Sequence, residues 1–269
     1  MAYPTIPERL SDANLREYFN LRSDDLELSK RIRHDSTRLG FLVLLKSFQY
    51  LGYPPHEKTA IPAFIVKWIS AQVGLNPDLF NRYKWKNRTW DLHISIIRDH
   101  TGFRPCEADD SSELHVWLTQ KTNDKPARND LLDSAVQKCR NNQIELPSEK
   151  ELLLLVNSAR NSFFQDVYQK ISDRLTPEIK DRMKACLKAG ETDTTEYDWI
   201  KSKAGRLGMP SILEEIRKLN FIRQFNLEPE ICFKGISQEA LRYFKKRALP
   251  ENSYQMDRHP VPICHTYIS

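Results

Sequence analysis

The sequence predicts an all-α protein with two helical domains, and three observations support this. Apolar residues recur at helical spacing through most of the chain, alternating strand-like patterns are nearly absent, and glycines such as Gly52, Gly74 and Gly102 follow the helical segments. With 269 residues the chain is long enough for two domains of ordinary size. We place the first domain at residues 1–143 and the second at residues 144–269, and we expect the second to be truncated at its C-terminal end.

The helices expected in the first domain cover residues 11–19, 36–51, 62–73, 89–100 and 130–141, with a further start at Ser23. Ser11 is a cap residue, and Leu15, Tyr18 and Phe19 form the expected buried side of the first helix. Residues 121–130 are polar and rich in turn-forming residues, so they are expected to form a loop. The chain from Phe41 to Leu45 is continuously apolar, which indicates a mostly buried helix.

The second domain begins with a capping box at Ser148 and Glu151, which opens a long helix over residues 149–172. Thr176 and Pro177 open a further helix that we expect Gly190 to end. A second capping box pairs Ser211 with Glu214 at the start of a leucine- and isoleucine-rich helix. Ser237 opens the last expected helix, which runs to Leu249.

Composition excludes several classes of protein. No apolar run approaches the roughly 20 residues of a spanning helix, and the first ten residues hold no secretory signal. The five cysteines stand far apart, so no disulfide framework is expected, and the spacing of His259, Cys264 and His265 matches no familiar zinc pattern. The sequence also lacks a phosphate-binding loop, a nucleophile elbow and a metalloprotease motif. We therefore expect an intracellular, cytoplasmic protein whose own residues catalyse no reaction and hold no cofactor.

Basic residues are collected in two blocks. Residues 31–104 carry a net charge of +7, residues 105–196 carry −4, and residues 197–249 carry +5. Such segregation is typical of a protein that meets a polyanion at two places, although an unevenly charged solvated surface would look the same. The pattern favours nucleic acid as a partner without deciding it.

The most informative stretch runs from Asn81 to Arg104. Four cations, Arg82, Lys84, Lys86 and Arg88, alternate with less polar residues, so in an extended chain they would project to one side. Thr89 is the expected cap of the following helix, on which Trp90, Ile94 and Ile97 form a buried row. With the helix over residues 62–73, this helix would form a helix-turn-helix variant that enters the major groove. The alternative is an ordinary packing helix with a solvated basic lead-in.

We predict that side chains of this region and of the second basic block contact DNA. Phosphate contacts are assigned to the cations, and the helix after residue 88 is expected to face base edges or backbone. The predicted DNA-binding residues are Arg31, Arg33, Arg38, Lys46, Arg82, Lys84, Lys86, Arg88, Thr89, Asp91, His93, Ser95, Arg98, Arg104, Lys201, Lys203, Arg206, Arg242, Lys245 and Lys246.

Several short segments, in this order and spacing, resemble one family. They are Leu10-Ser11-Asp12 with Glu17-Tyr18-Phe19, Arg38-Leu39-Gly40-Phe41, Tyr50-Leu51-Gly52-Tyr53-Pro54-Pro55, Tyr83-Lys84-Trp85, Arg88-Thr89, Ile97-Arg98, Gly102-Phe103-Arg104, Arg174-Leu175-Thr176-Pro177 and Ser211 to Phe225. Together they resemble the N-terminal region of Tn-three family transposases, the enzymes of replicative unit transposons. The resemblance covers nearly the whole chain.

The resemblance implies that this region binds double-stranded DNA at the terminal inverted repeats of a transposon. It also implies that the divalent metal and the acidic residues of strand transfer lie in a catalytic domain outside this chain, and that the protein works at the nucleoid. The equivalent DNA role is in doubt for residues 251–269, which are less basic than the family pattern. A second interpretation remains open, in which the chain is a dimerisation module and the apolar stripe from Leu152 to Ile171 is its seam, with only non-specific DNA contacts.

Overall fold

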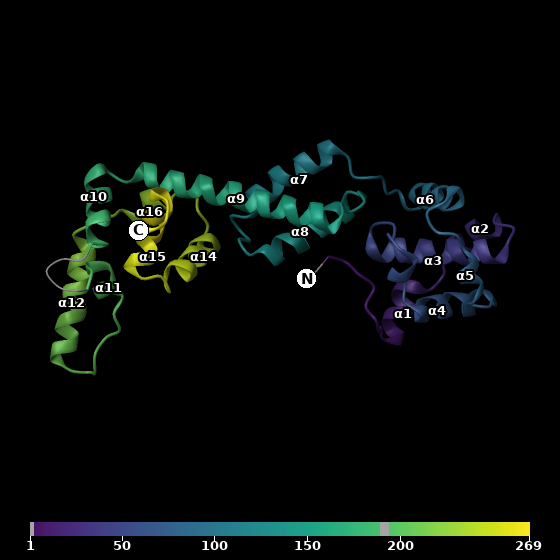
Figure 1. Cartoon of the computed structure of the whole chain (residues 1–269), viewed down its shortest axis with the longest axis horizontal. Coiled ribbons are helices and arrows are strands. Elements are labelled where there is room, and N and C mark those ends of the chain that lie inside the picture. Colours follow the sequence, from purple (N-terminus) through teal and green to yellow (C-terminus); the bar gives the residue numbers. More distant parts are fainter. Residues whose placement is uncertain (1–2, 189–193) are drawn as a thin grey trace. The chain divides into compact units, whose positions relative to one another are not determined.

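The computed structural model describes residues 3–188 and 194–269, and these residues form helices and no strands (Figure 1). The all-α class is therefore confirmed for the described chain. In order the helices are α1 (Asp12–Phe19), α2 (Ser23–Lys30), α3 (Asp35–Leu51), the 3-10 turn η1 (Lys58–Ala60), α4 (Ala63–Val73), α5 (Leu79–Arg82), α6 (Arg88–Thr101), α7 (Ala108–Lys121), α8 (Arg128–Asn141), α9 (Glu149–Arg174), α10 (Pro177–Cys186), α11 (Glu196–Lys201), α12 (Met209–Arg223), α13 (Pro229–Cys232), α14 (Gln238–Ala248), α15 (Ser253–Asp257) and α16 (Val261–Ile268).

The described chain divides into two compact units. The first contains the described residues up to Leu114 together with Leu132–Leu155, and the second contains His115–Leu131 together with the described residues from Val156 onward. The assignment of separate DNA-binding domains to residues 1–143 and 144–269 concerns function and stays a prediction. Among the described residues, no helix combines the length and the apolar character needed to cross a membrane.

The first unit is organised around α3. This helix is apolar on nearly every side, and each of its residues from Leu39 to Phe48 is buried. A helix with this pattern must be covered all round, and α1, α2, α4, α5 and α6 pack against it. Gly52 ends it in the left-handed conformation that a residue without a side chain adopts at little cost. The predicted helix and its glycine stop are thus confirmed.

The second unit has two apolar clusters. One gathers Phe164, Tyr168 and Ile171 of α9 around Phe244 of α14, and the other gathers residues of α10–α13, α15 and α16. In α9, which both units share, Leu152 of the first unit is buried, and so are Val156, Ala159, Val167 and Ile171 of the second. The stripe considered as a dimer seam is therefore core, because its side chains are already covered within the chain.

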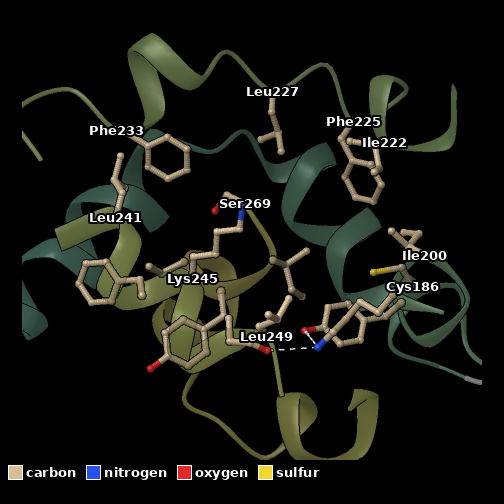
Figure 2. A pocket seen from close by; sticks show the side chains of 17 residues that line it. Cys186, Ile200, Ile222, Phe225, Leu227, Phe233, Leu241, Lys245, Leu249 and Ser269 are labelled. Carbon is tan, nitrogen blue, oxygen red and sulfur yellow. Dashed lines mark hydrogen bonds between the residues drawn. The ribbon is translucent and has the colours of Figure 1, made fainter. Parts of the chain in front are cut away.

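A half-open cavity of about 460 Å³ lies within the second unit (Figure 2). Its wall is largely apolar, with Ile222 and Phe225 on one side and Leu241 and Leu249 on another. Lys201 also borders it, and its ammonium group donates hydrogen bonds to the hydroxyl of Tyr197, to the carbonyl oxygen of Ala248 (3.1 Å) and to that of Glu251.

Several local predictions are wrong. Tyr18 lies on the outer side of α1 with 43% of its surface exposed, beside the Tyr50 ring. The helix expected from Ser211 begins two residues earlier, at Met209 after Gly208, with Pro210 in its first turn. The expected capping box is not formed, and Glu214 instead accepts a hydrogen bond from the Trp199 indole. The helix α10 ends at Cys186, and Gly190 lies outside the described residues. The helices α7, α11, α13, α15 and α16 were not expected at all.

Candidate nucleic-acid interface

Residues 82–88 form what we call the basic loop, between α5 and α6. Arg82, Lys84, Lys86 and Arg88 are exposed, whereas Tyr83 is buried and the residues at positions 85 and 87 are partly buried. None of the four cations makes an ion pair with any residue that the structure describes. The alternation of outward cations and inward side chains therefore holds, and the loop presents four uncompensated charges to solvent.

The loop is not the extended strand that the alternation suggested. Arg82 is the last residue of α5, Arg88 is the first residue of α6, and Lys86 has a positive φ of 53°. A left-handed residue turns the chain sharply, and here it turns the chain into the start of α6. The four cations lie on a compact bend between two helices rather than along a straight comb.

Tyr83 anchors the loop to the core. Its ring lies so close to Gly40 of α3 that a Cβ atom at residue 40 would sit 2.3 Å from ring carbons. Its hydroxyl shares a 2.8 Å hydrogen bond with Nδ1 of His93, and the two rings stack with centroids 5.6 Å apart. Burial lowers the pKa of His93 to about 4 and raises that of the Tyr83 hydroxyl, so both groups are neutral near pH 7.

Lys58 provides a second attachment. Its ammonium group donates hydrogen bonds to the carbonyl oxygens of Asn81 (3.0 Å) and Tyr83 (3.1 Å), and it lies 4.8 Å from the centre of the Phe80 ring. Partial burial lowers the pKa of Lys58. The indole of Trp85 also donates to the carbonyl oxygen of His56 (3.4 Å). The sequence gives no signal for Lys58, because its partners are backbone atoms more than twenty residues away.

The helix that follows is capped by Asn87 and not by Thr89. The Asn87 side chain accepts a hydrogen bond from the backbone N–H of Trp90 at 3.0 Å. Thr89 is partly buried in the first turn of α6. The backbone N–H groups of Arg88 and Thr89 have no carbonyl partner within the helix, because they lie in its first turn. The start of α6 thus lies beside the basic loop, where free amides and cations meet.

The outward face of α6 carries Arg88, Asp91 and Ser95, which are exposed as predicted. It also carries Leu92, which has 59% of its surface exposed and stands four positions after Arg88, although it is not among the predicted contacts. His93 lies on the opposite side, 3% exposed and against the rings of Tyr83 and Phe41. In this conformation His93 cannot face a base, because it is part of the packing beneath the loop.

Arg98 forms a salt bridge with Glu145 of the same chain. Its guanidinium donates to both oxygens of Glu145, at 2.6 and 2.9 Å, and this bond raises its pKa. Arg104 makes the same two-pronged contact with Asp110, which lowers the pKa of that carboxyl group to about 2. Both arginines would have to give up a carboxylate before they could hold a phosphate.

The remaining predicted cations of the first unit differ in exposure. Arg31 and Arg33 are exposed, while Arg38 is partly buried and donates to the hydroxyl of Ser29 at 3.3 Å. Lys46 is buried, and its ammonium nitrogen lies 3.4 Å from the equally buried carboxylate of Asp25. Burial lowers the pKa of Lys46. A cation at this depth cannot reach DNA, because it lies in the core that α3 builds.

In the second unit Lys203, Arg206, Lys245 and Lys246 are exposed, and none of them makes an ion pair within the described part of the chain. Arg242 lies 3.3 Å from Glu239 on the same helix face, in an exposed pair that solvent weakens. The ammonium group of Lys201 is bonded to the backbone of Ala248 and Glu251, as described above. The second basic block is therefore sparser at the surface than its sequence suggests.

The cluster considered for zinc is engaged in other contacts. His259 lies 2.6 Å from the Glu251 carboxylate, and Nδ1 of His265 lies 2.9 Å from the Ser172 hydroxyl. Burial lowers the pKa of His265 and raises that of the Cys264 thiol to about 11. No group of three or more histidine, cysteine, aspartate or glutamate side chains among residues 3–188 and 194–269 is arranged to hold a metal ion.

Comparison with known proteins adds to this geometry. The model of one protein family, described as "Domain of unknown function (DUF4158)", matches residues 1–159, which is more than half of the chain. The chain belongs to the DUF4158 family. The matched residues include α3 and the basic loop.

Several proteins that are similar to the chain are transposases. The chain is 28% identical over 231 residues to the transposase for transposon Tn1546 of Enterococcus faecium, a match that covers 84% of this chain and 23% of that protein. It is 25% identical over 238 residues to the transposase for transposon Tn501 of Pseudomonas aeruginosa, covering 88% of this chain and 24% of that protein. The transposase for transposon Tn2501 of Escherichia coli is 22% identical over 225 residues.

These matches confirm the resemblance to the N-terminal region of Tn-three family transposases, and the chain is related to transposases. It spans about a quarter of the length of these relatives. The activity of those longer proteins is therefore not carried over to this chain by similarity alone.

Proposed function

We propose that this chain binds double-stranded DNA at the terminal inverted repeats of a replicative transposon. The observation that carries the proposal is the basic loop. Its four exposed cations make no ion pair with any described residue, and they lie on a bend that Tyr83 and Lys58 attach to the core. Transposase relatives that match most of the chain make transposon ends the natural duplex to test. In this proposal the chain recognises DNA at the nucleoid and needs no cofactor, and metal-dependent strand transfer belongs to a separate catalytic domain.

The basic loop supplies the phosphate contacts. Cations held on a fixed scaffold contact successive phosphates without a large loss of side-chain and backbone entropy, and each such contact releases a counterion from the duplex. Attachment of the loop at Tyr83 and Lys58 limits the movement of its backbone. Arg31 and Arg33 are candidates for further phosphate contacts in the same unit, and Lys203, Arg206, Lys245 and Lys246 in the other.

The outward face of α6 supplies the base contacts. Asp91 can accept a hydrogen bond from the amino group of cytosine, Ser95 can donate or accept, and Leu92 can contact a thymine methyl group. We leave His93, Arg98 and Lys46 out of the interface, because one is packed beneath the loop, one is held by Glu145 and one is buried with Asp25. The helix-turn-helix arrangement of α4 with α6 remains part of the proposal.

The test is a footprint and a titration of the chain on a terminal-repeat duplex and on a scrambled duplex of equal length, each at several salt concentrations. We expect protection of the repeat and tighter binding to it than to the scrambled duplex, with affinity falling steeply as salt rises. Equal affinity for both duplexes would remove sequence recognition. Absence of binding at low salt would remove the DNA function altogether.

A matched control separates the basic loop from general charge. Lys125 is an exposed cation in the connection between α7 and α8, and Arg128 is the exposed first residue of α8. Replacing both by alanine removes two positive charges far from the loop in sequence, and we expect a smaller change in salt dependence than the Lys84→Ala, Arg88→Ala double variant gives. Equal changes would show that the loop has no special role.

A further inference from the structure

The connection between α2 and α3, residues 31–34, carries two outward arginines, and we call it the arginine bend. Arg31 and Arg33 are exposed, whereas Ile32 between them is partly buried. The backbone N–H of Ile32 donates to the carbonyl oxygen of Ser29 at 3.1 Å. Neither guanidinium group makes an ion pair within the described part of the chain. The bend therefore presents two arginines to solvent around an inward side chain.

The arginine bend lies at the same end of the first unit as the basic loop. The ring of Phe41 in α3 lies 5.1 Å from that of His93 in α6, and further along the ring of Phe48 lies 5.6 Å from that of Phe103, just after α6. The two helices therefore run in the same direction. Measured along each helix, α3 starts about 9 Å before Phe41 and α6 about 8 Å before His93.

Their first residues are therefore nearly level, with the arginine bend before one helix and the basic loop before the other. Helices in contact have axes about 8 to 10 Å apart, and α3 and α6 pack against each other. The arginine bend thus stands to the side of the start of α6 by about one helix spacing.

This spacing can be compared with the grooves of a duplex. A recognition helix lies in the major groove and contacts base edges with its N-terminal residues, which is the role proposed for α6. The major groove is about 12 Å wide, so its wall lies about 6 Å from its middle. A segment about 8 to 10 Å to the side of the helix has passed over the strand that forms this wall. Beyond that strand lies the minor groove.

Arginine is the side chain suited to that groove. Its guanidinium group is planar and more weakly hydrated than an ammonium group, and the negative potential of a narrow, A·T-rich minor groove attracts it. At a G·C pair the amino group of guanine projects into the minor groove, where it opposes another N–H donor. The arginine bend contains no lysine, whereas the basic loop contains two, as phosphate contacts allow.

We propose that Arg31 and Arg33 insert into the minor groove beside α6 and make the protein prefer A·T pairs there. The inference rests on the proposed DNA function and goes beyond it, because it assigns these two arginines to base edges and names the pairs that they select. It makes them specificity-determining residues, at a place where α6 itself touches no base.

Base analogues test the groove on the terminal-repeat duplex. Each A·T pair of the footprinted segment is replaced in turn. A diaminopurine·thymine pair adds an amino group in the minor groove and keeps the major-groove edge, whereas an inosine·cytosine pair keeps the minor-groove edge of A·T and changes the major-groove edge. At pairs flanking the α6 site we expect diaminopurine to weaken binding about tenfold and inosine to change it less than about twofold. Pairs beneath α6 should show the reverse.

A change that keeps charge tests the two side chains. The Arg31→Lys, Arg33→Lys double variant should keep the salt dependence, bind the repeat about fivefold to tenfold more weakly, and lose its sensitivity to diaminopurine. Arg9 and Arg16 are exposed arginines elsewhere in the first unit. The Arg9→Lys, Arg16→Lys double variant is therefore the matched control, and it should keep both the affinity and the sensitivity. Circular dichroism and thermal melting verify that each variant is folded.

Two results would overturn the inference. One is a flanking segment where diaminopurine has no effect, and the other is an effect that persists in the Arg31→Lys, Arg33→Lys variant. Weaker binding by that variant without any effect of diaminopurine would assign both arginines to phosphates alone. A chain that binds the repeat selectively but shows none of these effects keeps the proposed function and loses this inference, whereas a chain that binds no duplex loses both.

Discussion

The basic loop and the exposed side of α12 are both open surfaces, yet they expose opposite chemistry. The loop shows four cations and hides Tyr83 beneath them, whereas α12 hides its Lys218 and shows Ile212, Ile216 and Leu219. Salt screens the first surface and has little effect on the second. Exposed charge and exposed apolar surface are therefore separated along the chain, so each can be altered by mutation without changing the other.

The largest expected effect comes from removing all four cations of the loop. Arg82→Ala, Lys84→Ala, Lys86→Ala and Arg88→Ala together should weaken binding to every duplex and lower the salt slope by about 3 to 4, because each phosphate contact contributes about one. Fluorescence anisotropy at several salt concentrations measures this. An unaltered slope would show that the loop does not touch the phosphates.

Attachment of the loop is tested at Gly40. In Gly40→Ala the new methyl group collides with the Tyr83 ring, which cannot move without leaving His93. We expect a loss of about 1 to 3 kcal/mol in the free energy of unfolding, measured by urea denaturation. DNA binding should weaken further than stability alone explains, because the loop loses its position. Gly74→Ala is a useful comparison, since no atom lies within 4 Å of a Cβ at that glycine and only its left-handed backbone is strained.

A structural feature could be predicted from the sequence when the residues that determine it lie close together in the chain. Caps and glycine stops are local, so α1, α3, α9 and α14 could be predicted within a residue or two. The inward and outward alternation of the loop is also local, and it was predicted even though the bend at Lys86 was not. Short helices such as α11 and α13 carry too few turns for a periodic signal.

Contacts between distant residues escaped prediction. The burial of Lys46 depends on Asp25, the capture of Arg98 depends on Glu145, and the attachment of the loop depends on Lys58. The residues of each pair are brought together by tertiary packing against α3 or at the ends of helices. Their spacing in the sequence does not predict these contacts. A count of basic residues therefore overestimates the cations that are free to bind DNA.

The pH dependence of the free energy of unfolding tests whether His93 is buried in its neutral form. Burial lowers the pKa of His93 in the folded protein to about 4, below the ordinary value of 6.5. The unfolded chain therefore binds more protons between these values, and stability falls as the pH drops from about 6.5 to about 4. In His93→Gln this contribution should disappear, so the slope of unfolding free energy against pH should be shallower than in the unaltered chain. Equal slopes would show that His93 titrates normally.

The smallest expected effect comes from Lys86→Gly, which separates the role of the lysine charge from that of the left-handed backbone. This lysine has a φ of 53°, a conformation that glycine adopts without strain, so Lys86→Gly removes the charge while relieving the backbone. We expect the free energy of unfolding to stay within about 1 kcal/mol of the original and the salt slope of DNA binding to fall by about one. Lys84→Ala removes an equal charge where the backbone is not left-handed, and it should lower the slope equally. If Lys86→Gly leaves the slope unchanged while Lys84→Ala lowers it, the bend positions the loop and its lysine lies outside the contact.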